Sequence, residues 1–182
     1  RFYEYIDILN KSETGIISFQ MGCYEKEWTT KEILNYFKID SEDNIANTGQ
    51  ILDGILIMKK NINLIKLINI WYKACYDNPL MITDYYNDNQ HSYFIDNRHE
   101  QSVFSIIRKM HSPILLEDET NFYPTFGSEE SLKYPFWATR IKNRNRRKWN
   151  WKKYRKIIKI SILFVFIYFL FSNSEYGYYY WF

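Results

Sequence analysis

The chain lacks the residues and motifs that mark several large enzyme classes. It has two cysteines, Cys23 and Cys75, and its three histidines stand at no spacing typical of a zinc site. It shows no signal-peptide pattern and no cysteine-rich framework, which favours a reducing compartment. It also has no glycine-rich phosphate loop, no nucleophile elbow and no Ser-His-Asp spacing. These absences count against a zinc enzyme, a P-loop nucleotidase and an α/β-hydrolase.

An initiating methionine is missing as well. The sequence begins at Arg1, already within an apolar and aromatic run. We therefore expect a fragment or a processed chain that lacks upstream sequence.

Charge is distributed unevenly along the 182 residues. The net charge of +3 combines an acidic part with a basic one. Residues 1–139 contain 13 lysines and arginines against 20 aspartates and glutamates, whereas residues 140–159 contain 11 basic residues and no acid. The whole chain is 46% hydrophobic and 25% charged, which is typical of a globular domain with a real core.

The hydrophobic pattern predicts helices that alternate with strands. Helical spacing marks residues 1–10, residues 31–37 after a Thr29 or Thr30 cap, residues 63–76, and a run that closes near Lys109. Short apolar runs predict strands at residues 15–20, 51–58 and 113–116. The longer segments between them, residues 40–49, 84–97 and 117–130, are polar and predict loops. This alternation indicates an α/β domain.

The segment DNRHEQSVFSIIRK, residues 96–109, is the strongest candidate for a site. Its ionisable residues precede an apolar stripe of Val103, Phe104, Ile106, Ile107 and Met110 at helical spacing. A helix N-terminus carries partial positive charge, which suits a phosphate or a carboxylate. The same pattern also fits an ordinary helix cap with solvated charges, and both interpretations stay open.

Several short segments together resemble the C-terminal half of GT-A type glycosyltransferases. They are QILDGILI at residues 50–57, the tryptophan-bearing helix after it, RHEQSVFS at residues 98–105, ILLEDE at residues 114–119 and YPFWATRIK at residues 134–142. The resemblance covers about residues 1–142. It implies a partial, Rossmann-like mixed sheet with flanking helices that lacks its N-terminal nucleotide-binding half.

What the resemblance implies is transfer of a sugar from a nucleotide-sugar donor to a carbohydrate or glycan acceptor. Such enzymes hold Mn²⁺ or Mg²⁺ on an Asp-x-Asp motif, because carboxylates bind hard cations and the cation neutralises the leaving diphosphate. This chain has no Asp-x-Asp, so its cation ligands are expected upstream of Arg1 and the chain alone is expected to be inactive.

The resemblance also assigns roles to residues. Glu100 would be the catalytic residue, orienting or deprotonating the acceptor hydroxyl. The expected substrate-binding residues are Gln50, Asp53, Gly54, Arg98, His99 and Gln101. A strand-entry role for Gln50 and a β-bulge or strand end for Asp53 stay open as simpler interpretations. The acids of residues 117–119 could bind a cation, although a solvated loop is favoured.

The C-terminal part differs in kind from the rest. We divide the chain into a domain at residues 1–139, a basic juxtamembrane segment at residues 140–159, and a hydrophobic and aromatic tail at residues 160–182 as a possible membrane anchor. The apolar run at residues 160–171 is shorter than the ~20 residues that span a bilayer. The basic segment would stay on the cytoplasmic side, together with the catalytic part.

The basic segment interleaves aromatic residues with its charges, and two functional interpretations compete. One is an anionic membrane surface and the other is nucleic acid, and the adjacent apolar run favours the membrane. The alternative to the glycosyltransferase is therefore a non-enzymatic membrane-attached or nucleic-acid-binding protein.

Overall fold

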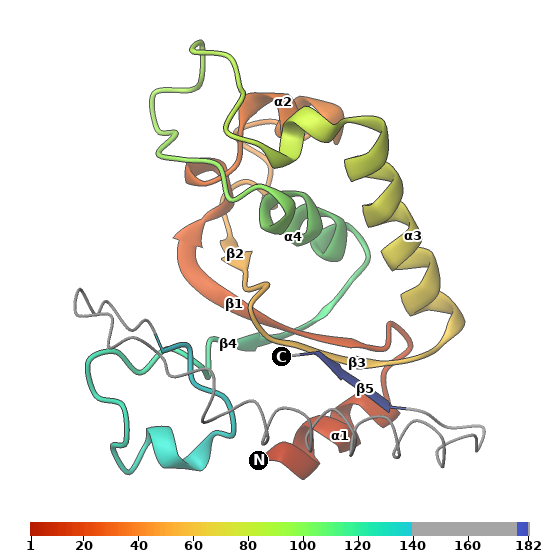
Figure 1. The fold of residues 1–182 in the computed structure, drawn as a ribbon, viewed down its shortest axis with the longest axis vertical. Helices are drawn as coiled ribbons and strands as arrows, with labels where there is room; N and C mark the ends of the chain where they lie inside the picture. Colours follow the sequence, from red (N-terminus) through yellow and green to blue (C-terminus); the bar gives the residue numbers. More distant parts are fainter. Residues whose placement is uncertain (140–177, 182) are drawn as a thin grey trace, which may run out of the picture. The chain divides into compact units, whose positions relative to one another are not determined.

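The computed structural model describes residues 1–139 and 178–181, which form an α/β fold with a mixed open sheet and flanking helices (Figure 1). The predicted alternation of helices and strands is thereby confirmed. The elements in chain order are α1 (Phe2–Asn10), β1 (Ile16–Tyr24), the 3₁₀ turn η1 (Glu25–Glu27), α2 (Lys31–Tyr36), β2 (Gly49–Ile51), β3 (Leu56–Lys59), α3 (Ile62–Asp77), the 3₁₀ turn η2 (Pro79–Ile82), α4 (Glu100–Met110), β4 (Ile114–Glu117), the 3₁₀ turn η3 (Ser131–Lys133) and β5 (Tyr178–Trp181).

Strand β1 is the centre of the sheet. It pairs antiparallel with β2 and β3 and parallel with β4, and β5 lies next to β3. Ile17 of β1 is paired with Ile57 and with Ile114, so these two partners lie on opposite sides of it. Since Gln20 is likewise paired with β2 and β4, β2 and β3 follow one another along one edge of β1 and β4 occupies the other.

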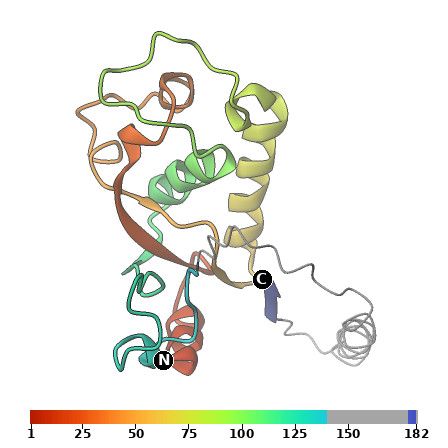
Figure 2. The ribbon, with the colours of Figure 1, turned by 60° about the vertical axis from the view of Figure 1, so that its left-hand side comes forward.

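The sheet separates two hydrophobic cores, because successive side chains of a strand point to opposite faces. Ile16 of β1 joins the core formed by α2, α3 and α4, whereas Ile17 joins the core under α1. Figure 2 shows α1 on one side of the sheet and α3 and α4 on the other. Helix α4 packs against both α3 and β2, so it is the central helix of the larger core.

Two helices begin at side-chain caps. The Oγ1 of Thr30 accepts a hydrogen bond from the backbone N–H of Ile33, which confirms the predicted cap of α2. The Oδ1 of Asn61 accepts one from the N–H of Leu64 at 2.7 Å and starts α3. Such caps satisfy N–H groups that the first helical turn leaves unpaired.

The prediction of one continuous strand at residues 51–58 is wrong. Ile51 pairs with Gln20 and Ile57 pairs with Ile17, so six steps along this edge match three steps along β1. The three surplus residues leave the ladder as an enlarged bulge at residues 53–55, which separates β2 from β3. The simpler interpretation of Asp53 as part of a β-bulge therefore agrees with the backbone.

One apolar side chain of the predicted 103–110 stripe lies outside the core. Met110 of α4 is 49% exposed. In α4, Met110 is the last residue, and the core ends one turn before it.

The basic segment 140–159 and the apolar run 160–171 lie outside the described residues, and so do the predictions made for them. Within the described part of the tail, Tyr178–Trp181 forms β5. Among the residues that the structure describes, no helix combines the length and the apolar character needed to cross a membrane.

Candidate functional site

Helix α4 buries polar residues as well as its apolar stripe. Val103, Phe104, Ile106 and Ile107 are fully buried, as predicted. Fully or almost fully buried polar side chains occupy four other positions of the same helix: Ser102, Ser105, Arg108 and Lys109. Buried polar groups cost free energy unless they are hydrogen-bonded. The partners of these four residues therefore define the polar framework of the site.

The carboxylate of Glu25 is the centre of that framework. This fully buried residue of η1 accepts hydrogen bonds from Thr29 at 2.9 Å, from Gln50 at 3.0 Å and from Ser105. The ammonium of Lys109 lies 2.7 Å from its Oε2 and also donates to backbone carbonyls. Burial lowers the pKa of Lys109, and the negative charge of Glu25 opposes that shift. The pair thus joins the end of α4 to η1.

Gln50 connects this framework to the predicted patch. Its side-chain amide donates to Glu25 and to Ser102, and its carbonyl accepts a hydrogen bond of 3.0 Å from Gln101. Gln50 has no exposed surface, so in this structure it cannot touch a ligand directly. Its visible role is to hold Gln101, which is partly exposed.

Arg108 holds the bulge between β2 and β3. Its guanidinium, which is fully buried, donates to the carbonyl of Leu52 at 3.1 Å, and it lies over the ring of Phe104. Burial lowers the pKa of Arg108 to about 10. One guanidinium nitrogen lies 3.9 Å from the Oδ1 of Asp53, which is within ion-pair range but too long for a hydrogen bond.

The carboxyl group of Asp53 is largely buried and incompletely paired. Its Oδ1 has no hydrogen-bond partner among the described residues. Burial raises the pKa of Asp53, the guanidinium of Arg108 opposes the shift, and the negative charge of Glu100 adds to it. Asp53 and Glu100 are therefore close enough to interact electrostatically. Glu100 itself is exposed at the first position of α4.

Gly54 is exposed to solvent next to Asp53. A Cβ atom built on Gly54 would meet no atom within 4 Å, so this position is free of the close contact that a strand glycine often indicates. The bulge thus presents Asp53 and Gly54 together, and open space remains next to them.

Arg98 and His99 are engaged by other elements. The guanidinium of Arg98 lies 4.2 Å from the ring of Trp28, and the His99 ring contacts Asp84 at 2.7 Å. His99 has φ 52° and ψ −125°, which are rare for a residue other than glycine and store backbone strain. The strained turn sets the direction in which α4 begins. It places Glu100 and Gln101 next to the bulge but leaves Arg98 and His99 on the side of the 84–97 loop.

Sequence patterns did not reveal Glu25, Ser105, Arg108 or Lys109 as parts of this site. A charged residue in a 3₁₀ turn or at the end of a helix is normally solvated. The spacing within α4 gave no signal of this burial. Ser102, Ser105, Arg108 and Lys109 lie on the face opposite the apolar stripe, as the solvated residues of an ordinary amphipathic helix do.

No cation site forms among the described residues. They contain no group of three histidine, cysteine, aspartate or glutamate side chains that could hold a metal. In the acidic segment after β4, Glu119 bonds to Arg1 and Tyr5, and Asp118 accepts from the N–H of Thr120 at 3.0 Å. These acids stabilise the chain itself, so they do not fit the Mn²⁺ or Mg²⁺ that the resemblance implied.

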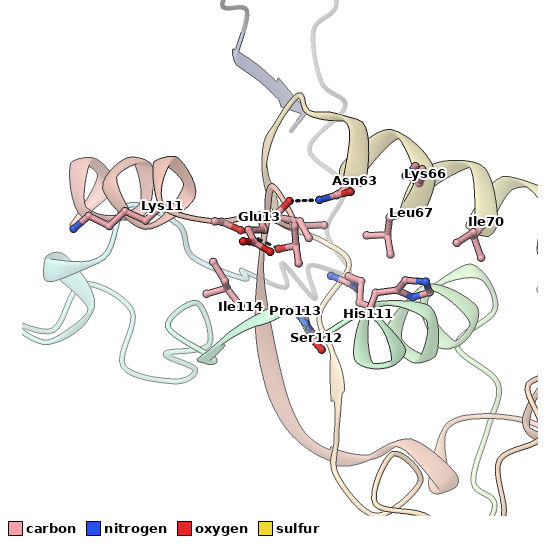
Figure 3. Close-up of a pocket in the computed structure, with 14 residues that line it drawn as sticks. Lys11, Glu13, Asn63, Lys66, Leu67, Ile70, His111, Ser112, Pro113 and Ile114 are labelled. Atoms are coloured by element: carbon pink, nitrogen blue, oxygen red, sulfur yellow. Dashed lines mark hydrogen bonds between the residues drawn. The ribbon is translucent and has the colours of Figure 1, made fainter.

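A separate groove lies at the other end of α4. It has a volume of about 650 Å³ and is lined by the α1–β1 loop, by α3 and by the segment that follows α4 (Figure 3). We call it the α3–α4 groove. In Figure 3, Leu67 and Ile70 extend from α3 toward His111.

Comparison with known proteins found no match: no family model, no curated protein and no solved structure is similar to this chain. The chemistry of the site therefore rests on its own residues.

Proposed function

We propose that the chain is part of a glycosyltransferase and that the surface of Asp53, Gly54 and Glu100 contacts a sugar of the nucleotide-sugar donor or of the acceptor. The observation that supports this proposal is the Asp53 carboxyl, which is buried, lacks a hydrogen-bond partner among the described residues and has a raised pKa. Paired carboxyl groups in different environments are a common arrangement for acid and base catalysis. Sugar hydroxyls are natural partners for such groups.

The two carboxyl groups take different roles in this proposal. Glu100 is the group that orients or deprotonates the acceptor hydroxyl, because it is exposed at the first position of α4. Asp53 accepts a hydrogen bond from a sugar hydroxyl through Oδ2, because its Oδ1 is buried and faces Arg108. Gln101 contacts the sugar with its side-chain carbonyl oxygen, because its Nε2 donates to Gln50. Gln50 thereby positions Gln101. Arg98 and His99 reach a ligand only if they leave Trp28 and Asp84.

Binding of nucleotide sugars to the full chain tests the proposal. Saturation-transfer NMR with a panel of nucleotide diphosphate sugars and free sugars, each with and without Mn²⁺, would detect weak contacts. We expect sugar protons to receive saturation from the unmodified chain. Asp53→Asn and Glu100→Ala should each reduce the apparent affinity about tenfold, since each removes a charge-assisted hydrogen bond.

A matched acidic variant controls for net charge. Glu129→Ala removes an exposed carboxylate in the loop before η3, and it should leave sugar binding unchanged. Thermal unfolding of all variants separates lost binding from lost structure. If no sugar or nucleotide sugar binds the folded chain, or if Glu129→Ala weakens binding as much as Glu100→Ala, the proposal is wrong.

The alternative function, a membrane-attached or nucleic-acid-binding protein, depends on residues 140–159, which lie outside the described part. It stays a prediction from sequence. A salt-titrated comparison of anionic vesicles with single-stranded DNA distinguishes its two forms, because both respond to salt but only one requires lipid.

A further inference from the structure

The α3–α4 groove has the size and lining of a small-molecule site. Its volume of about 650 Å³ lies within the range of ~300–1,000 Å³ that is typical of ligand pockets. Ile16, Leu67, Ile70 and Pro113 supply an apolar lining. Leu67 is almost fully buried, so the floor of the groove belongs to the larger core and is rigidly held.

The charges at the groove are mainly positive. Lys11, Lys66 and Arg108 line it, against a single acid, Glu13. Figure 3 shows Lys11 extending away from the other lining residues, and the donors of Arg108 are taken by backbone carbonyls. Lys66 is exposed and has no partner among the described residues. Its ammonium is therefore the cation that remains available to a ligand.

Helix ends at the groove add to this preference. Asn63 and Lys66 belong to the first turns of α3, a 16-residue helix whose N-terminus carries partial positive charge. At the opposite wall, the Nδ1–H of His111 donates to the carbonyl of Ile107 at 2.8 Å. That hydrogen bond covers part of the negative end of α4. The electrostatics thus favour an anion near α3.

We propose that the α3–α4 groove binds a small anionic amphiphile. Its apolar body lies against Leu67, Ile70 and Pro113, and its carboxylate or phosphate meets the ammonium of Lys66. The groove borders the end of α4, whereas Glu100 lies at its beginning, so this proposal does not depend on the glycosyltransferase proposal.

Matched single-chain probes test the charge preference. The full chain is titrated with decanoate and decyl phosphate below their micelle concentrations, and with decanol and decyltrimethylammonium as neutral and cationic counterparts. We expect saturable binding of at least one anionic probe, about tenfold tighter than binding of decanol or of the cation. The tighter of the two anions identifies the head group. Equal binding of all four probes, or no saturable binding, overturns the proposal.

Two charge reversals on the same helix locate the site. Lys66→Glu should weaken anion binding about tenfold or more, because it replaces attraction with repulsion. Lys73→Glu is the control, since Lys73 is exposed, pairs with Asp77 and does not line the groove. Equal effects of the two variants overturn the proposal. Binding to vesicles that contain phosphatidylserine, without binding of either free anionic probe, also overturns it and assigns the surface to a membrane.

Discussion

Two glycines of neighbouring segments differ in how strongly the fold requires them. A Cβ on Gly49 would overlap the carbonyl oxygen of Met21 in the adjacent strand, whereas one on Gly54 would meet nothing. We expect Gly49→Ala to lower the free energy of unfolding by about 2 kcal/mol or more, because two backbones must separate. Gly54→Ala should change it by less than about 1 kcal/mol. Urea denaturation measures both, and similar losses would contradict the bulge geometry.

Asp53 should make stability depend on pH in a particular direction. Because burial raises its pKa, the folded state still holds a proton at pH values where the unfolded state has lost it. Ionisation of Asp53 therefore reduces stability as pH rises from its ordinary pKa through the raised pKa. We expect Asp53→Asn to melt at a higher temperature than the unmodified chain at neutral pH. The difference should shrink as pH falls below the ordinary range of aspartate.

Melting of the Asp53→Asn variant also tests whether the Asp53 carboxyl group serves function rather than stability. A carboxyl group that lowers stability is retained when function needs it. If Asp53→Asn gains stability and loses sugar binding, the two results together mark a functional residue. A melting difference that does not change with pH would show that its ionisation has no part in the effect.

At the scale of elements, α4 is attached to η1 by a buried ion pair whose loss can be measured. Glu25→Gln leaves the Lys109 ammonium buried without its counter-charge, which typically costs about 3–5 kcal/mol. Lys109→Met likewise leaves the Glu25 carboxylate buried without its counter-charge. The double variant should lose less than the sum of the two single losses, because it leaves no unpaired charge. Chemical denaturation of all four proteins gives the coupling energy, and strict additivity would contradict a direct pair.

The elements predicted correctly are those whose hydrophobic pattern is compatible with only one secondary structure. The α4 stripe of Val103, Phe104, Ile106 and Ile107 fits only a helical period, and Thr30 precedes its helix as a cap should. The ILDGILIM run is compatible with two structures, one continuous strand or two short strands around a bulge, because both contain the same apolar residues. The structure selects the second, since Arg108 supplies donors to the carbonyls at the break.

The candidate site shows the same limit. Glu100 and Gln101 could be singled out because they are polar residues at the start of a predicted helix, whereas Asp53 was singled out by the family resemblance. Gln50 and Glu25 could not be assigned to a shared network, because residues 25 positions apart give no local sign that their side chains meet. Only the tertiary arrangement decides which polar residues are buried.

At the scale of the whole molecule, α4 and β1 should be the most protected segments. Helix α4 packs against α3 and β2, and β1 pairs with three other strands. We expect the amides of residues 104–108 to exchange hydrogen only through global unfolding. Amides of the exposed loop at residues 85–89 should exchange about 100-fold faster or more. Hydrogen exchange followed by NMR measures this, and comparable rates would contradict a central α4.

The contact between Arg108 and the bulge also has a consequence for the order of folding. The guanidinium and the Leu52 carbonyl that it binds are 56 residues apart, so the chain must close a long loop before they meet. Until α4 has formed and docked, the carbonyls at the break between β2 and β3 lack this donor. We therefore expect the two short strands to acquire their final register late in folding, together with α4.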